Sequence, residues 1–547
     1  MNWINIYHLN TSRVMFMFHK FSQWLLIVLV AVAISACARV PLRHADTYTP
    51  PRPSASDEPF TLVEATIGDV HRAFRNGKLS CLELVREYLN RIKQYDSVSK
   101  LNAITFVNKR AVETALKLDG EFRRSGKLRS MHCVPLIVKD NFLTKDLPTT
   151  AGSQVLRSFI PDNDAFMVAA LKQAGALVLA KSNMAEWAFS PYFTISSTAG
   201  ETRNPYDLNR VPAGSSGGTA AAISANLGLV GLGTDTGNSI RGPASHTALV
   251  GIRSTLGSTS RSGVIPLLMN RDVAGPLTRT VEDAARVFAV IDAYDPEDPI
   301  TKKGRDKLPV DYTQSLSRSG LKGMRIGVLR TLVQPGDEDF EITEIFERAL
   351  RDLHKAGAVI VDAVDIPNFA ELRKINGFCS RFRYDINRFF KSMGDKVPVQ
   401  SLAQIVESGA FHETSKRAMD WAMSVDVAPE EQEIPCVDVE GDPRRKSYRD
   451  TVQWAMDKQQ LDALVYPTWT NPPRLLGDLD SPNGNNSPVI APHTGQPAIT
   501  VPMGFTQSGL PTGIQFLGRE FSEALLFQLA YAYEQATLHR QPPAMFP

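Results

Sequence analysis

The chain has 547 residues, 43% of them hydrophobic, which is enough apolar material to bury a large core. Its 60 basic and 58 acidic residues leave a formal net charge of +2, and no long basic run interrupts this balance. Nucleic-acid binding needs a concentrated positive surface, so this composition argues against a nucleic-acid partner and favours a small neutral or amphiphilic ligand.

Residues 1–36 have the pattern of a secretory signal. Lys20 precedes an apolar run, residues 24–36, which has the length of a signal-peptide core and is short for a membrane span. The run ends in Ile-Ser-Ala followed by Cys37, which resembles the lipobox of bacterial lipoproteins. We therefore predict an exported protein that is anchored to the bacterial cell envelope by a lipid on Cys37. The alternative is a signal anchor that is not cleaved.

The next segment, residues 37–59, is predicted to be a tether. Its residues 41–59 are rich in proline and charge and poor in large apolar side chains, which favours a semi-extended chain without a core. No internal repeat and no second proline-rich linker follows. Residues 60–547 are therefore predicted to form one domain.

Apolar periodicity within this domain alternates between helix and strand patterns. The segments predicted as helices are 66–115, with Ser80 as a helix cap, 164–174, 218–226, 340–355 and 523–535. The segments predicted as strands are 134–138, 177–180, 229–233, 324–329, 359–361, 464–466 and 499–501. This alternation predicts an α/β fold in which a large mixed, mostly parallel, twisted sheet is covered by helices on both faces. Ligands of such sheets bind beyond the carboxyl ends of the strands.

Residues 368–449 break the alternation. They combine many aromatic and charged residues with a loop-like stretch, which predicts an insertion that covers the site; ordinary surface helices are the alternative. The aromatic residues Phe378, Phe382, Tyr384, Phe389 and Phe390 could line an apolar acyl pocket, although burial statistics favour core positions for such residues.

Four cysteines follow Cys37 in the sequence, namely Cys81, Cys133, Cys379 and Cys436. They form no C-x-x-C pair and show no spacing typical of a metal site. In an exported protein they allow three disulfide pairings, and free buried thiols are equally compatible with the sequence.

Residues 211–245 hold two Ser/Gly clusters separated by a run of alanines and short aliphatic residues. A flexible turn before a helix is the simplest interpretation of the first cluster. A phosphate-binding loop is disfavoured because the lysine and spacing of G-x-x-x-x-G-K-[ST] are missing, and neither cluster contains the G-x-S-x-G nucleophile elbow. The remaining hypothesis is a serine hydrolase whose base is not histidine.

A lysine can serve as that base if it is uncharged. Lys139 directly follows Ile137 and Val138 at the end of a predicted buried strand, where loss of water lowers the pKa of an ammonium group. With two serines, one can attack while the other relays protons between the attacking serine and the lysine.

From residue 66 to the carboxyl terminus, the sequence resembles the amidase signature family. The strongest motif is the first Ser/Gly cluster followed by GLGTDTGNSIRGPAS. The supporting segments are VPLIVKDNF, GALVLAKSNMAEWA, AGPLTRTVEDAA, LKGMRIGVLR, LDALVYPT and QPAITVPMGFTQSGLPTGIQFLGREFSEALLFQLAYAYEQAT. Seven segments in family order are far more specific than one glycine-rich loop.

The resemblance implies a Ser-cisSer-Lys triad. Ser239 corresponds to the nucleophile, Ser215 to the bridging serine after a cis peptide bond, and Lys139 to the base. The backbone N–H groups of residues Thr236, Gly237, Asn238 and Ser239 would form the oxyanion hole. The resemblance also implies that Ser216, Asp235 and Arg241 hold these loops, although Asp235 and Arg241 could equally be an ordinary structural pair.

Two positions depart from the family pattern. The chain has Asn238 and Ala213 where the family usually has glycine. Asparagine tolerates a positive φ better than most residues, so we expect Asn238 to keep the turn and to narrow the acyl pocket. Ala213 is expected to have the smaller effect.

The family resemblance implies hydrolysis of a carboxylic acid amide through an acyl-enzyme, with no metal or organic cofactor. Two alternatives remain: a glutaminase subunit of a tRNA-dependent amidotransferase, and a catalytically silent binding protein on the same fold. The expected partner is a small-molecule amide, with membrane attachment through the amino terminus, and a homodimer is left open.

Overall fold

The computed structural model describes residues 60–307, 311–334, 336–375 and 379–547. The predicted signal, the tether and Cys37 lie outside this part of the chain. The helices are α2 (Ile67–Arg75), α3 (Cys81–Arg91), α4 (Ala111–Ser125), α5 (Phe166–Gln173), α6 (Gly217–Ser224), α7 (Arg241–His246), α8 (Val281–Ile291), α9 (Phe340–Lys355), α10 (Phe369–Leu372), α11 (Phe382–Met393), α12 (Leu402–Ser408), α13 (Lys416–Met423), α14 (Pro443–Lys458), α15 (Ala491–Thr494) and α16 (Glu523–Thr537). Among these described residues, no helix combines the length and the apolar character needed to cross a membrane.

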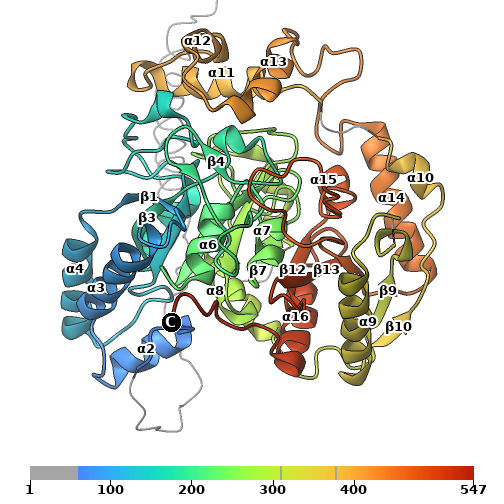
Figure 1. The fold of residues 1–547 in the computed structure, drawn as a ribbon, viewed down its shortest axis with the longest axis horizontal. Coiled ribbons are helices and arrows are strands. Elements are labelled where there is room, and N and C mark those ends of the chain that lie inside the picture. Colours follow the sequence, from blue (N-terminus) through green and yellow to red (C-terminus); the bar gives the residue numbers. More distant parts are fainter. Residues whose placement is uncertain (1–59, 308–310, 335, 376–378) are drawn as a thin grey trace, which may run out of the picture. The chain divides into compact units, whose positions relative to one another are not determined.

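A sheet of 11 strands runs through the centre of the described residues, with helices packed around it (Figure 1). Its strands lie in the order β1-β3-β2-β6-β8-β7-β12-β13-β11-β9-β10. The strand bounds are β1 (Ile104–Val107), β2 (Pro135–Lys139), β3 (Leu177–Ser182), β6 (Val230–Asp235), β7 (Val250–Arg253), β8 (Val273–Thr278), β9 (Arg325–Val328), β10 (Val359–Val361), β11 (Ala463–Pro467), β12 (Ala498–Phe505) and β13 (Pro511–Leu517). Two short strands, β4 (Ile195–Ser196) and β5 (Gly200–Glu201), form a separate hairpin.

The predicted α/β sheet is confirmed, but the expectation that it is mostly parallel was wrong. Parallel pairing is confined to β3-β2-β6 and to β11-β9-β10. The other neighbouring strands are antiparallel, namely β1–β3, β6–β8, β8–β7, β7–β12, β12–β13 and β13–β11. Of these, β12 and β13 are consecutive strands joined by a short loop. Strand β8 follows a long loop, so the sequence contained no strand–helix–strand pattern from which it could be predicted.

Both faces of the sheet centre are covered. Every residue of β2, β3, β6 and β8 is buried, as expected for strands with helices on each side. Helices α6 and α7 contact each other above β6 and β7, whereas α8 contacts α16 and β8. Because β2 and β6 are parallel neighbours, their carboxyl ends reach the same edge of the sheet.

The helix and strand patterns located about half of the elements; they missed strands β1, β7, β8 and β13 of the large sheet and helices α7, α8 and α10 to α15. Helix α9 and strand β10 have the predicted bounds. Ser80 caps α3, because its hydroxyl accepts a hydrogen bond from Glu83 N while the Glu83 carboxylate accepts one from Ser80 N. The segment 66–115 is not helical throughout, since its residues Ile104–Val107 form β1 on β3.

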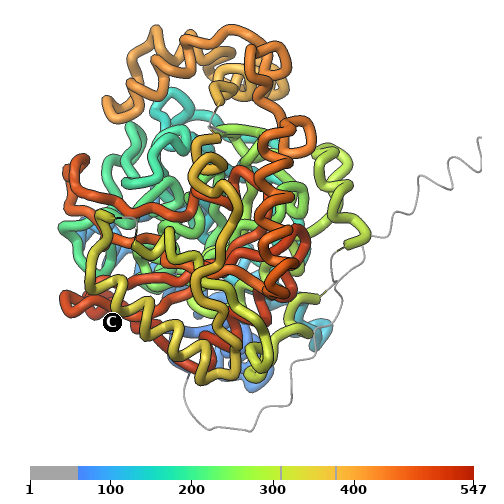
Figure 2. Tube along the Cα trace, turned by 90° about the vertical axis from the view of Figure 1, so that its right-hand side faces the viewer, coloured from blue at the N-terminus to red at the C-terminus, as the bar shows by residue number. Residues whose placement is uncertain are grey.

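Two disulfide bonds resolve the pairing that the sequence left open. Cys81 pairs with Cys133, and Cys379 pairs with Cys436. The second bond brackets residues 379–436, which contain α11, α12 and α13 and which we call the cap. The cap lies at the top of the molecule in both Figure 1 and Figure 2.

Candidate active site

Lys139 is the last residue of β2, and its side chain is fully buried. Its Nζ lies 2.7 Å from Ser215 Oγ and 2.7 Å from Thr234 Oγ1. The Asn141 amide reaches the same Thr234 hydroxyl at 3.2 Å. Within the described residues, the amine is therefore held between two hydroxyl groups on neighbouring segments, and no carboxylate contacts it directly.

The surroundings of Lys139 favour an uncharged amine. Burial lowers the pKa of Lys139 to about 7, although the nearby carboxylates Asp272 and Asp235 oppose this shift. Lys181, the other lysine of the sheet centre, differs because its Nζ forms an ion pair with Asp140 Oδ1 at 3.2 Å. Of these two buried lysines, Lys139 is the one that has only hydroxyl partners.

Ser215 lies in the turn that precedes α6, and the peptide bond between Gly214 and Ser215 is cis. The turn packs closely against residues 183–194: a Cβ on Gly214 would lie 2.3 Å from Phe193 O, so no larger residue fits there. The Ser215 carbonyl also accepts a hydrogen bond from Ala185 N at 3.1 Å. These contacts fix the turn and with it the Ser215 hydroxyl.

Ser239 lies in the turn that follows β6, and its side chain is almost fully buried, with 5% of the residue exposed. Asn238 connects this turn to the Ser215 turn, because its Nδ2 donates to Gly214 O at 3.1 Å. Within the described residues, the Ser239 hydroxyl makes no hydrogen bond to Ser215 or Lys139. The Lys139 amine thus contacts the Ser215 hydroxyl directly, and Ser239 lies in the adjacent turn.

Four successive backbone N–H groups in the Ser239 turn have no partner in the described part of the protein. They belong to Thr236, Gly237, Asn238 and Ser239. The next N–H group, that of Ile240, donates to Asp235 Oδ2 at 3.3 Å. A run of unpaired donors beside a buried hydroxyl is the arrangement that an oxyanion requires.

Comparisons with known proteins identify the family of this chain. A sequence model of the amidase family matches residues 83–527. The chain belongs to the amidase signature family. A probable amidase from Arabidopsis thaliana is 33% identical over 506 residues, covering 88% of this chain and 92% of the relative. A glutamyl-tRNA(Gln) amidotransferase subunit from Thermosynechococcus vestitus is 31% identical, covering 88% of this chain and 100% of the relative.

Solved structures show the same relationship. Native peptide amidase from Stenotrophomonas maltophilia is 34% identical and superposes with a TM-score of 0.78, covering 89% of this chain and 100% of that chain. An amidase family protein from Bacillus anthracis is 33% identical with a TM-score of 0.76, covering 88% of this chain and 92% of that chain. The protein is therefore an amide-hydrolysing enzyme.

In this amidase, a buried ionic network supports the Ser239 turn. The Arg241 guanidinium donates to both carboxylate oxygens of Asp235, at 3.1 and 3.2 Å, and to Gly237 O at 2.7 Å. Arg253, which the sequence pattern did not indicate, adds an ion pair to Asp235 at 3.1 Å. Burial raises the pKa of Asp235, but the two guanidinium groups outweigh burial and hold its pKa below the ordinary value. Asp235 and Arg241 are thus a structural pair that also fixes the turn.

Ser216 follows Ser215 in the turn before α6. Its hydroxyl binds the backbone of β6 and does not bind the Ser215 side chain. Its Oγ donates to Thr234 O at 3.2 Å and accepts from Thr234 N at 3.3 Å. Thr234 therefore contacts both the amine of Lys139 and the turn that carries Ser215.

Three further residues at the site were missed by sequence reasoning. Asn141 lies in the turn that directly follows β2, and a polar residue just beyond the carboxyl end of a buried strand was a usable signal. Thr234, one residue before the predicted Asp235, sits at the end of β6 next to Lys139. Asp272 accepts a hydrogen bond from the Thr236 hydroxyl at 2.5 Å and from the N–H groups of Leu267 and Leu268, and no sequence signal connects it to that turn.

The two departures from the family pattern differ from expectation in which residue has the positive φ. Ala213 occupies the left-handed region with φ of 64°, a conformation that costs a residue other than glycine about 1–2 kcal/mol. Asn238 has no positive φ, so its tolerance for that conformation does not explain its presence. Its side chain points to Gly214 O and Pro191 O.

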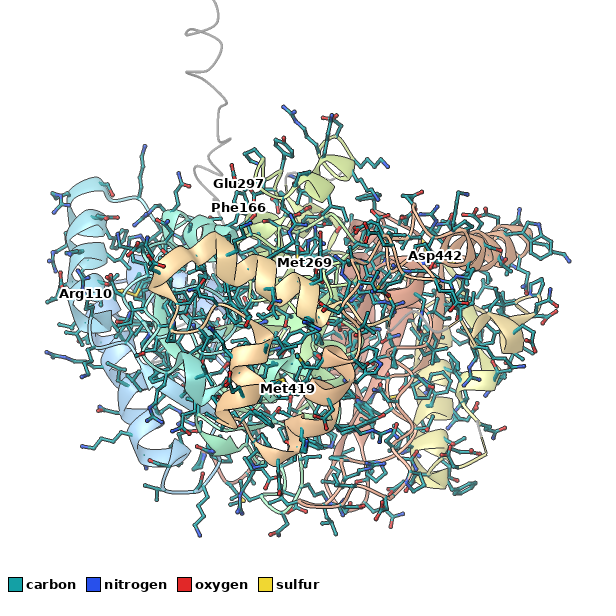
Figure 3. The ribbon with its side chains drawn as sticks, turned by 90° about the horizontal axis from the view of Figure 1, so that it is seen from above. Arg110, Phe166, Met269, Glu297, Met419 and Asp442 are labelled. Carbon is teal, nitrogen blue, oxygen red and sulfur yellow. A yellow bond between two sulfur atoms is a disulfide. The ribbon has the colours of Figure 1, made fainter. Side chains whose placement is uncertain are left out.

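The cap contacts the core through residues next to the Ser215 turn. Phe382 of α11 packs edge to face on Phe189 at 4.8 Å and on Trp187 at 6.1 Å between ring centroids. Phe382 and Phe390 are core residues, as burial statistics favour; Phe378 lies outside the described residues. Figure 3 shows Met269 beside the helices of the cap, and its N–H donates to Asp385 of α11 at 2.9 Å.

The Glu186 carboxylate is a second connection between cap and core. It accepts hydrogen bonds from His412 N at 2.7 Å and from the Ser415 hydroxyl at 2.8 Å. Glu186 belongs to the same segment that packs against Gly214 and Ser215, so the cap rests on one wall of the candidate site. No group of His, Cys, Asp and Glu side chains arranged to hold a metal ion occurs among the residues that the structure describes.

Proposed function

We propose that the protein hydrolyses a carboxylic acid amide to the acid and ammonia or an amine, with Ser239 as nucleophile, Ser215 as proton relay and Lys139 as base. One observation carries this proposal: the fully buried Lys139 amine lies 2.7 Å from the Ser215 hydroxyl and has a pKa lowered to about 7. An uncharged amine accepts a proton, and a hydroxyl in contact with it can deliver that proton.

The first half of the proposed cycle forms an acyl-enzyme. Ser239 Oγ attacks the carbonyl carbon while its proton passes to Ser215 Oγ, and the Ser215 proton passes to Lys139 Nζ. The carbonyl oxygen becomes an oxyanion and accepts hydrogen bonds from the N–H groups of residues 236–239. The carbon–nitrogen bond then breaks, and the leaving nitrogen takes a proton that returns from Lys139 through Ser215.

The second half releases the acid. Water attacks the ester carbon of the acyl-enzyme, and its proton follows the same relay to Lys139. The tetrahedral intermediate collapses, the bond to Ser239 Oγ breaks, and the serine recovers its proton through Ser215. The cycle uses side chains of this protein and water alone, with a small-molecule amide as partner.

One observation, the pair of disulfide bonds, favours a stand-alone amidase over an amidotransferase component. The sequence relatives include amidotransferase subunits, which their name connects to glutamyl-tRNA(Gln). Two disulfide bonds, Cys81–Cys133 and Cys379–Cys436, are typical of an oxidising compartment outside the cytosol, where aminoacyl-tRNA is absent. The presence of Lys139, Ser215 and Ser239 in adjoining segments argues against a silent binding protein.

The test uses the purified chain alone and a panel of aliphatic, aryl and peptide amides together with free glutamine. We expect release of ammonia or amine, with equimolar acid, from at least one amide class without any partner protein or tRNA. The panel includes peptide amides because a solved relative is named a peptide amidase. Turnover that occurs only with glutamine, and only after the other amidotransferase components are added, would assign the chain to the amidotransferases.

We further propose that the protein is exported and held at the bacterial envelope through Cys37. The support comes from the lipobox-like residues before Cys37 and from the disulfide bonds. Expression of the wild-type chain and of Cys37→Ser, followed by membrane fractionation, distinguishes the cases. Loss of membrane association in the variant is expected; equal association of both proteins would favour an uncleaved signal anchor instead, and recovery of the wild type in the cytosol would contradict export.

A further inference from the structure

We propose that the Asn238 side chain is a positioning residue that ties the turn carrying the nucleophile to the turn carrying the proton relay. The inference rests on the function proposed above for Ser239 and Ser215. It adds a role for a side chain at a position where the family usually has glycine, which has no side chain to play such a part.

The hydrogen bonds of Asn238 cross between three segments. Its Nδ2 donates to Gly214 O at 3.1 Å and to Pro191 O at 3.3 Å. A primary amide nitrogen carries two hydrogens, so both are used. Gly214 directly precedes Ser215, and Pro191 accepts a further hydrogen bond from Gly214 N at 2.9 Å. One amide group therefore connects the residue before Ser239 with the residue before Ser215.

Packing confines this amide group. Asn238 is 1% exposed. A Cβ built on Gly242 would lie 2.3 Å from Asn238 Nδ2, so the amide occupies the space that any side chain at position 242 would need. Trp469 borders the same space, since a Cβ on Gly242 would lie 3.0 Å from its Cζ2, and its Nε1 donates to Gly242 O at 3.1 Å. The amide cannot swing away from its two acceptors without displacing these neighbours.

The backbone offers no other reason for asparagine here. Asn238 does not have a positive φ, so the residue is not selected for the left-handed conformation. Both of its acceptors are carbonyl oxygens, which require a donor. An aspartate of the same shape would place a carboxylate oxygen against those carbonyls.

Such a connection acts on the alignment of the two hydroxyls rather than on substrate binding. The relay requires Ser239 and Ser215 within hydrogen-bond reach during proton transfer, and a displacement of about 1 Å can cost about 100-fold in rate. Loss of the Asn238 amide is therefore expected to lower kcat and to leave KM nearly unchanged.

The experiment compares Asn238→Gly and Asn238→Asp with the wild type on one small primary amide. Both variants are expected to lose about 10- to 100-fold in kcat, with KM changed by less than about threefold. Thermal unfolding should shift downward but stay cooperative, and the shift should be larger in Asn238→Asp, whose buried carboxylate faces two carbonyl oxygens. Asn102→Asp is the matched control, because its Nδ2 also donates to two carbonyls, Ala199 O and Glu201 O, but touches neither turn. The control is expected to keep kcat within about twofold.

A double-mutant cycle separates positioning from a general loss of structure. Gly242→Ala should push on the Asn238 amide and lower kcat about tenfold in the wild type, but less than about threefold in Asn238→Gly, where the amide is absent. Equal losses in both backgrounds would overturn the inference, as would wild-type kcat in Asn238→Gly or in Asn238→Asp.

Failure of this inference is distinguishable from failure of the proposed function. If a fluorophosphonate modifies Ser239 of the wild type and Asn238→Gly turns over at the wild-type rate, only the role of Asn238 is refuted. If Ser239 is not modified and Ser239→Ala still hydrolyses amides, the proposed function itself fails.

Discussion

Replacement of Ser239 by alanine is expected to lower kcat/KM for amide hydrolysis by about 10⁴- to 10⁶-fold, since the acyl-enzyme can no longer form. The variant should fold normally, because the Ser239 hydroxyl makes no hydrogen bond within the described residues that its loss would break. Steady-state assays of ammonia release with the best amide from the panel provide the measurement.

Ser245→Ala is the matched control for this experiment. Ser245 is a buried serine of α7, six residues after Ser239, and its Oγ also lacks a hydrogen-bond partner within the described residues. The control is expected to keep activity within about twofold of the wild type. Equal activity of Ser239→Ala and Ser245→Ala would rule out Ser239 as the nucleophile.

The second large effect is expected from Lys139, through the pH dependence of the reaction. Because the base is the uncharged amine and burial lowers the pKa of Lys139 to about 7, kcat/KM of the wild type should rise with pH up to about 7 and level off above it. Below that pKa the amine is protonated, so the rate should fall about tenfold for each pH unit. A pH–rate profile from pH 5 to pH 9 measures both limbs.

Lys139→Met removes the amine and retains a side chain that fits an apolar environment. We expect the amide rate at pH 8 to fall by about 10³-fold and the rise near pH 7 to disappear. An activated ester should lose less, because its leaving group needs no proton. A variant that keeps the wild-type profile for amides would show that Lys139 is not the base.

The elements predicted best are those whose neighbours in sequence are also their neighbours in space. Helix α9 and strand β10 follow each other directly, and the apolar spacing of α9 and the short apolar run after Gly357 predicted their bounds. Strand β8 was missed because its partners β6 and β7 precede it along the chain and a long loop separates it from both. Local periodicity carries no information about such pairing, and the antiparallel share of the sheet was therefore underestimated.

The candidate site shows the same contrast between features that local sequence predicts and contacts that only the fold creates. Lys139 was predicted from its place at the end of a buried strand and Ser215 from the resemblance to the amidase signature family, and the structure places their side chains 2.7 Å apart. Arg253 and Asp272 reach the Ser239 turn only through the folding of β7 and β8, so their contribution was invisible in the sequence. The roles of these residues in the reaction remain predictions.

Position 213 and position 238 show how a family comparison can misdirect a conformational argument. Both replace glycine, and the expectation placed the positive φ at Asn238. The structure places it at Ala213, whereas Asn238 makes side-chain hydrogen bonds that a glycine lacks. The two replaced glycines thus have different physical consequences. Ala213 adopts a strained backbone conformation, and Asn238 adds two hydrogen-bond donors.

The most direct test of the proposed chemistry is reaction of the intact protein with a fluorophosphonate, followed by peptide mapping by mass spectrometry at several pH values. We predict a single adduct on Ser239, formed at a rate that rises with pH up to about 7 in the wild type and loses this rise in Lys139→Met. An adduct on a different residue, or modification of Ser239 at a rate that does not depend on Lys139, would contradict the account.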